Sequence, residues 1–218
     1  MRNNFDKELE NLNLDLIKMG SMIEDAIDKA ITVIKKQDSE MARAAIDDDN
    51  AIDEMERNIE SKCLKLLLHQ QPVAKDLRLI STALKIVTDM ERIGDHAGDI
   101  SELFIRMGDG CYLNKLEHIP EMGDMAAKMV KLSVDAFVRK DIVLAEQVIQ
   151  MDDEVDRLFN ISKNDLSALL INDQCCIDEV IDSLLIVKYF EKIGDHAENI
   201  AEWVIFSVTG EHKNKRII

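Results

Sequence analysis

Acidic side chains recur at intervals of three and four residues in two stretches of the sequence, and they are the residues best suited to bind a cation. The first stretch holds Glu91, Asp95, Asp99 and Glu102. The second holds Glu191, Asp195, Asn199 and Glu202, in which an amide replaces one carboxylate. Because an α-helix turns about 100° per residue, each set falls on one face, within an arc of roughly 80°. The spacing predicts two acidic stripes, each on its own helix.

An acidic pair of the form Asp-x-x-x-Asp precedes each stripe. The pairs are Asp49 with Asp53 and Asp152 with Asp156. Apolar residues continue the line of each pair and each stripe along the helix, so these carboxylates should point into or along a helical bundle. Like charges at this spacing are mildly destabilising even on a surface, and burial against another helix raises the cost.

Crowded carboxylates of this kind need a compensating cation. We expect Arg106 near the first stripe and Lys188 near the second, but one basic side chain does not balance three or four acids. A metal ion would balance them. Sites rich in carboxylates and free of thiolates suit iron, our first choice, or zinc, manganese or magnesium, and bridging carboxylates could hold more than one ion. A solvated acidic face without metal is the alternative interpretation.

One histidine directly follows an acid of each stripe: His96 follows Asp95, and His196 follows Asp195. They lie about 100° round the helix from the stripe, a direction that favours a bond to a neighbouring helix over a metal bond. No pattern typical of a catalytic nucleophile, a phosphate-binding glycine loop or a His/Asp dyad occurs in the sequence. We therefore predict that the protein is not an enzyme.

Long helices have to position these side chains. Only two Pro and eight Gly occur in 218 residues, too few for many strands joined by tight turns. Apolar residues recur with helical spacing in six segments. These segments are 5–36, 39–69, 73–106, 120–139, 141–170 and 177–209. The predicted fold class is all-α.

The second half of the sequence repeats the first. Eight of twelve positions are identical when residues 91–102 (ERIGDHAGDISE) are aligned with residues 191–202 (EKIGDHAENIAE), and residues 38–53 match residues 141–156 more weakly. Short connections favour antiparallel neighbours, so the repeat predicts two tandem, pseudo-symmetric three-helix bundles. The predicted parts are a first bundle (1–107), a linker (108–118), a second bundle (119–210) and a polar, frayed tail (211–218).

Composition narrows the possible partners and the compartment. A formal net charge of −16 argues against a sequence-independent nucleic-acid binder. The N-terminus lacks the apolar segment of a signal peptide, and no apolar run approaches the ~18 residues of a membrane span. Four Cys without a Cys-x-x-Cys pair indicate reduced thiols rather than a disulfide framework. We expect a cytoplasmic protein that meets a membrane only through a partner.

The two motifs at 91–97 and 191–197, the duplicated layout and the two Asp-x-x-x-Asp pairs resemble the signature of the PhoU family of phosphate-signalling regulators. The resemblance covers nearly the whole chain. It implies two symmetric three-helix bundles with multinuclear metal clusters at the acidic motifs. It also implies a cytoplasmic negative regulator of phosphate uptake and of the phosphate-starvation response. Such a regulator links the ATP-binding subunit of the phosphate ABC transporter to a sensor histidine kinase, and commonly forms a homodimer.

The family motif transfers residue by residue to metal candidates in both halves. The candidates are Asp49, Asp53, Glu91, Asp95, Asp152, Asp156, Glu191 and Asp195, with Asp99, Glu102, Asn199 and Glu202 as secondary ones. Asn199 departs from an all-acid stripe, which predicts unequal occupancy of the two sites.

Two rival functions remain open at this point. One is a di-iron carboxylate enzyme or ferritin-like store, whose sites use Glu-x-x-His. No His here follows an acid by three residues, since those positions hold Leu66, Ile93, Lys115, Ile193 and Thr209. The other rival is a purely structural helical adaptor with acidic grooves filled by water.

Overall fold

Six long helices and one short hairpin make up the part of the chain that the computed structural model describes, residues 2–69, 73–108, 118–172, 177–213 and 215–216. The helices are α1 (Arg2–Lys36), α2 (Ser39–His69), α3 (Ala74–Met107), α4 (His118–Arg139), α5 (Ile142–Asn172) and α6 (Ile177–Thr209). The predicted all-α class is confirmed, and each helix lies close to its predicted bounds. The predicted linker lies outside the described residues over 109–117.

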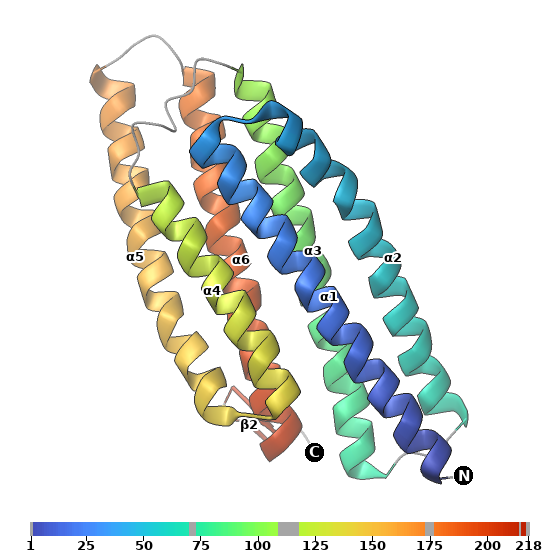
Figure 1. Cartoon of the computed structure of the whole chain (residues 1–218). Helices are drawn as coiled ribbons and strands as arrows, with labels where there is room; N and C mark the ends of the chain where they lie inside the picture. Colours follow the sequence, from blue (N-terminus) through green and yellow to red (C-terminus); the bar gives the residue numbers. More distant parts are fainter. Residues whose placement is uncertain (1, 70–72, 109–117, 173–176, 214, 217–218) are drawn as a thin grey trace.

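The helices form two three-helix bundles side by side, as the repeat predicted (Figure 1). Helices α1, α2 and α3 pack together in one bundle, and α4, α5 and α6 in the other. Two contacts join the bundles, α3 against α6 and α1 against α4. Helices α3 and α6 run antiparallel, because Arg106 near the end of α3 meets Asp182 near the start of α6. The long helices α2 and α5 lie at the two outer edges (Figure 1).

The same tight turn joins the first two helices of each bundle. In each turn one residue has a left-handed backbone conformation: Gln37, with φ 58°, and Lys140, with φ 54°. An aspartate follows each of them. The next residue caps the following helix: Asp38 Oδ1 accepts the backbone N–H of Met41 at 3.0 Å, and Asp141 Oδ1 accepts that of Leu144 at 3.1 Å. A side-chain cap satisfies a backbone donor that the helix itself leaves free. The duplicated Asp therefore fixes where α2 and α5 begin.

One apolar core runs through both bundles. Its largest fully buried side chains include Leu16 and Ile23 of α1, Met90 of α3 and Phe190 of α6. Burial of these side chains is the main source of stability, since each contributes about 1.5–3 kcal/mol when removed from water. Helix–helix contact is close where α1, α4 and α6 meet. A Cβ atom at Gly123 would lie 2.9 Å from Ile31 and 3.1 Å from the Phe190 ring.

Polar contacts cross between the bundles along α3 and α6. His196 Nδ1 lies 2.8 Å from Asp89 Oδ1, which confirms that this histidine bonds to a neighbouring helix. His96, its repeat partner, stacks on Tyr189 with ring centroids 5.2 Å apart. Arg106 forms a bidentate ion pair with Asp182. The prediction that Arg106 compensates the first stripe is therefore wrong, because Asp182 of the other bundle holds its guanidinium.

The end of the chain is ordered by a hairpin instead of the frayed tail predicted from its polar composition. Strand β1 (Glu211–His212) pairs antiparallel with β2 (Lys215–Arg216), and His212 packs against Trp203 of α6 with ring centroids 4.0 Å apart. The polar composition of the tail gives no indication of this aromatic contact. Residues 214 and 217–218 of the tail lie outside the described part.

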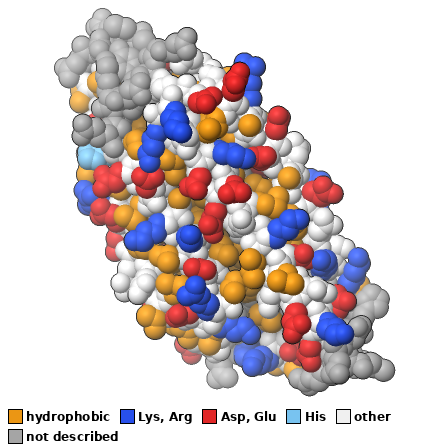
Figure 2. Space-filling model, viewed as in Figure 1, with side chains coloured by type: hydrophobic (Ala, Val, Ile, Leu, Met, Phe, Trp, Pro, Cys, Tyr) orange, Lys and Arg blue, Asp and Glu red, His pale blue; other side chains and the backbone are white. Residues whose placement is uncertain are grey.

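The surface formed by α1 and α4 carries both signs of charge. Figure 2 shows acidic and basic side chains interspersed on this face, with apolar side chains between them. The excess of negatively charged side chains is therefore not concentrated on this face. Among the described residues, no helix combines the length and apolar character needed to cross a bilayer.

Two glycine substitutions should change stability in opposite directions. Gly123→Ala should lower the free energy of unfolding by about 1–3 kcal/mol, because the new methyl group overpacks the contact with Ile31 and Phe190. Gly98→Ala should raise it by up to about 1 kcal/mol through helix propensity, since its Cβ would meet only Asp49, at 4.0 Å. Urea unfolding followed by circular dichroism, with a chelator present, measures both. Equal effects would contradict the packing described above.

Candidate functional site

The first carboxylate site lies between α2 and α3. Asp49 and Asp53 of α2 and Asp95 of α3 each offer a carboxylate oxygen, and these oxygens all lie within 4.8 Å of one another. Asp49 and Asp95 also border a groove of about 120 Å³. Its lining residues are Ile46, Asp49, Asp95, Gly98, Asp99 and Glu102. The structure thus brings together the predicted acidic pair of α2 and the predicted stripe of α3.

Burial makes the first site electrostatically unfavourable when no cation is bound. Asp49 Oδ1 is buried and has no hydrogen-bond partner among the described residues. Its pKa is raised, first by burial and then by the charges of Asp95 and Asp53. Burial and the charge of Asp95 raise the pKa of Glu91 to about 7. A carboxylate oxygen that is buried without a donor is a site for a proton or a metal ion.

Arginines compensate part of the first site from its rim. Arg92 lies 3.1 Å from Asp95 and 3.4 Å from Glu91, and Arg57 lies 2.9 Å from Asp53. Both guanidinium groups are more than half exposed, so each pair stabilises the site only weakly. None of these pairs reaches the buried Oδ1 of Asp49.

The second set of acids lies between α5 and α6, but among the described residues no three of them bring their oxygens as close together as Asp49, Asp53 and Asp95 do. Asp152 Oδ1 is buried without a hydrogen-bond partner in the described part of the chain, as Asp49 Oδ1 is in the first site. Burial and then the charges of Glu198 and Asp195 raise the pKa of Asp152 to about 7. A Cβ atom at Gly194 would lie 3.3 Å from Asp152 Oδ1. Glycine at this point therefore lets α6 approach the carboxylate closely.

Lysines compensate the second site more fully. Lys188 Nζ lies 2.6 Å from Glu191, which confirms its predicted place at this stripe. Lys192 pairs with Asp195 and lies 3.4 Å from Glu191. Lys213 of the C-terminal hairpin lies 2.9 Å from Glu202. The sequence prediction of one basic residue per stripe underestimated both sites, because it counted residues along one helix and missed neighbours at i+3 and from other segments.

The predicted site residues differ in how deeply the structure places them. Glu191 is buried, while Glu102 and Asp156 are exposed at the rim. Asp99 lines the first groove. Asn199, its repeat partner, lines a separate cavity of about 680 Å³ that includes Asp89, Trp203 and His212. Asn199 is therefore placed away from Asp152.

Two carboxylates near the sites were missed by the sequence analysis. Glu56 of α2 is among the charges that raise the pKa of Glu91. Glu198 of α6 is the charge with the largest effect on the pKa of Asp152. The repeat alignment carried a signal for the second one, because Glu198 stands at the position of Gly98 in the first copy. That mismatch marks an acid added to the second site.

The donors at both sites are oxygen atoms of carboxylates. Within the described residues, the group of side chains that could hold a metal contains Asp49, Asp53 and Asp95 and no histidine or thiol. Such a donor set fits hard or borderline divalent and trivalent cations. It does not fit the Glu-x-x-His ligands of ferritin-like di-iron centres.

Known proteins with a similar sequence share this layout. The family model for the PhoU domain matches the chain twice, at residues 16–104 and 119–204. The phosphate-specific transport system accessory protein PhoU homolog of Clostridium acetobutylicum is 38% identical over 208 residues, covering 95% of each chain. The PhoU accessory protein of Escherichia coli K12 is 30% identical over 207 residues, covering 95% of this chain and 86% of the relative. These names describe accessory proteins, not enzymes.

Solved structures agree with the fold. The crystal structure of PhoU from Pseudomonas aeruginosa superposes with a TM-score of 0.90 at 36% identity, covering 95% of this chain and all of the other. That of the phosphate transport system regulatory protein PhoU from Streptococcus pneumoniae gives 0.87 at 28% identity, covering 95% and 98%. The resemblance found in the sequence is thereby confirmed.

Crowding at the two sites should make stability depend on pH in metal-free protein. The pKa of Glu91 rises from 4.5 to about 7 on folding, so the folded state binds the proton more tightly than the unfolded state. Stability is therefore lost as the pH rises from the lower value through the higher one. Glu91→Gln and Asp152→Asn remove this penalty. Each should raise the urea midpoint more at about pH 8 than at about pH 5.

The exposed acid Glu8 provides the control for this measurement. Glu8→Gln should leave the pH dependence of the urea midpoint as in the unsubstituted chain. A chelator must be present throughout, because a bound cation would compensate the same carboxylates. Parallel pH profiles for all four proteins would contradict the crowding described here.

Proposed function

Because the chain belongs to the PhoU family, we propose that it is a non-enzymatic accessory regulator of a phosphate transport system. Its relatives in Clostridium acetobutylicum and Escherichia coli are named as accessory proteins of a phosphate-specific transport system, and the similar Streptococcus pneumoniae structure as a regulatory protein of one. The similarity supports the transfer because it extends over 95% of this chain, including both bundles. The absence of a recognisable nucleophile or general acid–base pair in the sequence is consistent with a regulator.

The specific role that we propose is negative regulation of phosphate uptake and of the phosphate-starvation response from the cytoplasm. The protein would contact the ATP-binding subunit of a phosphate ABC transporter and a sensor histidine kinase, and would act as a homodimer. The net charge of −16 supports docking on basic surfaces of such partners, since complementary charge steers association. It disfavours nucleic acid as the target.

Metal binding at the two carboxylate sites forms the second part of the proposal. The observation that carries it is the buried, unpartnered Oδ1 of Asp49 and of Asp152, which recurs at repeat-related positions. Asp49, Asp53 and Asp95 would hold a cation in the first site, and Asp152 with Asp195 in the second. A bound cation would supply positive charge that the described side chains leave missing there.

The proposed cation is iron, with zinc, manganese or magnesium as alternatives, and neighbouring carboxylates could bridge two ions. A di-iron enzyme or ferritin-like store is the less favoured candidate. His196 Nδ1 lies against Asp89 of α3, and His96 is stacked on Tyr189 with its Nδ1 3.7 Å from Asp99. Neither histidine follows a glutamate by three residues, as the ligands of such centres do.

Elemental analysis tests the metal sites. Protein purified without chelator should contain at least one equivalent of transition metal, and Asp49→Asn with Asp95→Asn should remove at least half of the total, because the substitutions disable the first of the two sites. The exposed pair Asp47→Asn with Asp153→Asn serves as the matched control and should retain the full content. Metal content that is below one equivalent, or that both double variants lower equally, would refute metal binding at these sites.

Deletion of the gene tests the regulatory role. Cells without the protein should express phosphate-scavenging functions in phosphate-rich medium, because the proposed repression is lost. Alkaline phosphatase activity of the cells measures this. Return of the gene should restore repression, whereas normal repression in the deletion strain would refute the proposal.

A further inference from the structure

Large apolar side chains are exposed together at two opposite ends of the molecule, where α2 ends and α3 begins and where α5 ends and α6 begins (Figure 1). The first tip is formed by Leu64, Leu68, Val73 and Leu77, and the second tip by Leu170, Ile171, Ile177, Ile181, Leu184 and Leu185. Leu68 is 80% exposed and Ile171 81%. Apolar side chains that are exposed as a group mark an interaction site, whereas scattered single ones do not.

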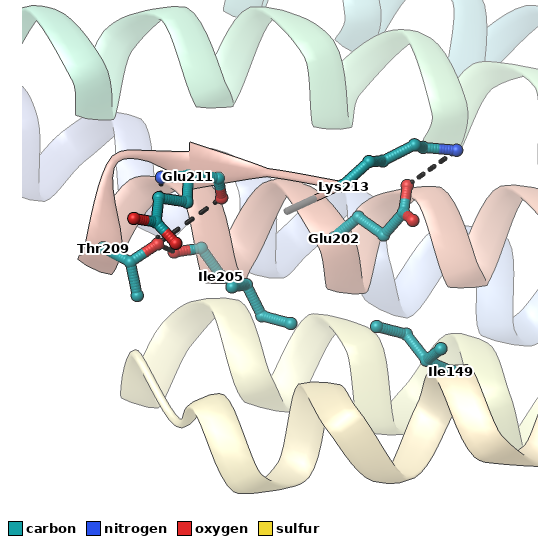
Figure 3. Close-up of a pocket in the computed structure, with 6 residues that line it drawn as sticks. All are labelled: Ile149, Glu202, Ile205, Thr209, Glu211 and Lys213. Atoms are coloured by element: carbon teal, nitrogen blue, oxygen red, sulfur yellow. Dashed lines mark hydrogen bonds and ion pairs between the residues drawn. The ribbon is translucent and has the colours of Figure 1, made fainter. Parts of the chain in front are cut away.

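The other end of α6 shows how the chain covers apolar side chains where it covers them itself. The C-terminal hairpin folds back there, and its Lys213 lies 2.9 Å from Glu202 (Figure 3). The two residues line one groove with Ile149 and Ile205, which are both partly buried. No described segment covers the two tips in this way, so their apolar side chains are accessible to another molecule.

The two tips occupy equivalent places in the repeat, and their apolar side chains match. When the repeat alignment is extended along the helices without gaps, it pairs Leu68 with Ile171 and Leu77 with Ile177. All four side chains are exposed. The duplication therefore kept a large apolar side chain at positions where neither bundle buries it.

The same alignment pairs charged residues of opposite sign. Lys62 is paired with Asp165, and Arg78 with Asp178. Arg78 Nε and Glu179 Oε2, one at each tip, are buried and have no hydrogen-bond partner among the described residues. Each tip thus holds a charged group that the described part of its own bundle leaves incompletely satisfied.

The charges near the two tips are complementary. Residues 64–68 and 73–78 contain three basic residues and one acid, namely Lys65, Lys75, Arg78 and Asp76. Residues 165–171 and 177–182 contain four acids and no basic residue, namely Asp165, Asp178, Glu179 and Asp182. Complementary charge around an apolar contact orients association, and like charge opposes it. The first tip therefore suits the second tip of another copy better than either tip suits its own kind.

We propose that the first tip of one copy docks on the second tip of another copy, and that two copies turned end over end form a closed dimer through two such contacts. Because the tips lie at opposite ends of each copy, one reversal of direction brings both pairs of tips together (Figure 1). Two equal contacts related by a two-fold axis leave no tip open for further growth. The inference identifies the surfaces of the proposed homodimer and depends on that part of the proposed function.

Sedimentation velocity of the full chain at a series of concentrations tests this proposal. Arg78→Glu gives the chain an acid at both paired positions, and Asp178→Arg gives it a basic residue at both. Each variant should dimerise about tenfold more weakly than the unsubstituted chain, because both contacts then join like charges. An equimolar mixture of the two variants should form dimers again, because each contact between unlike chains then joins opposite charges.

Lys128→Glu and Glu146→Arg are the matched controls, since both side chains are exposed on α4 and α5 away from the tips. Each control should dimerise as the unsubstituted chain does. Recovery of dimers in the mixture shows at the same time that both tip variants are folded.

The possible outcomes separate this inference from the proposed homodimer. Tip variants that dimerise as the controls do, a mixture that does not recover, or species larger than a dimer overturn the docking of tip on tip. If the unsubstituted chain forms dimers in those cases, only this inference fails. If the unsubstituted chain is monomeric at every concentration, the proposed homodimer fails as well.

Discussion

Carboxylates that are crowded between two helices are the constraint on which the rest of this structure depends. Asp49 and Asp152 each bury an oxygen atom that receives no hydrogen bond from any described residue. An ionised carboxylate in such a position raises the free energy of the folded state unless a proton or cation compensates it. The sites therefore oppose the packing of α2 on α3 and of α5 on α6. Contacts elsewhere have to hold these helices together.

Those contacts are apolar and occur at repeat-related positions beside each site. Ile52 of α2 packs against Gly94 of α3, and Val155 of α5 packs against Gly194 of α6. Each glycine lets its helix approach a β-branched side chain three residues after the buried acid. The close approach costs helix propensity, up to about 1 kcal/mol for each glycine. In return, the register between the two helices is set by apolar packing, so the acids face one another whether or not a cation is bound.

The helices, the duplication and the acidic stripes were predictable from the sequence, because each of them follows from local or periodic sequence patterns. Sequence reasoning placed Asp49 and Asp95 on the bundle-facing sides of their helices, because those faces follow from helical geometry, but it did not determine which helices share a site. It misplaced Arg106, whose partner Asp182 is set by the antiparallel register of α3 and α6. It missed Lys213 as well, because a tail of polar residues gives no sign that His212 will pack on Trp203. Partners of long charged side chains depend on tertiary register, and periodicity does not encode that.

Duplication preserved the scaffold of the two sites while their compensating charges diverged. The first site has an open backbone at Gly98 and exposed arginines at its rim, and the second has Glu198 and three lysines. A site neutralised by its own lysines costs less free energy when it is empty, so it gains less when a cation binds. A site left short of positive charge gains more from the same cation. On the proposed metal binding, the two bundles would take up cation unequally at one concentration, because their carboxylates are compensated by different side chains. The difference in compensation arises from one exchange at repeat-related positions, Gly98 in the first copy and Glu198 in the second, and from a lysine that the C-terminal hairpin brings back to Glu202.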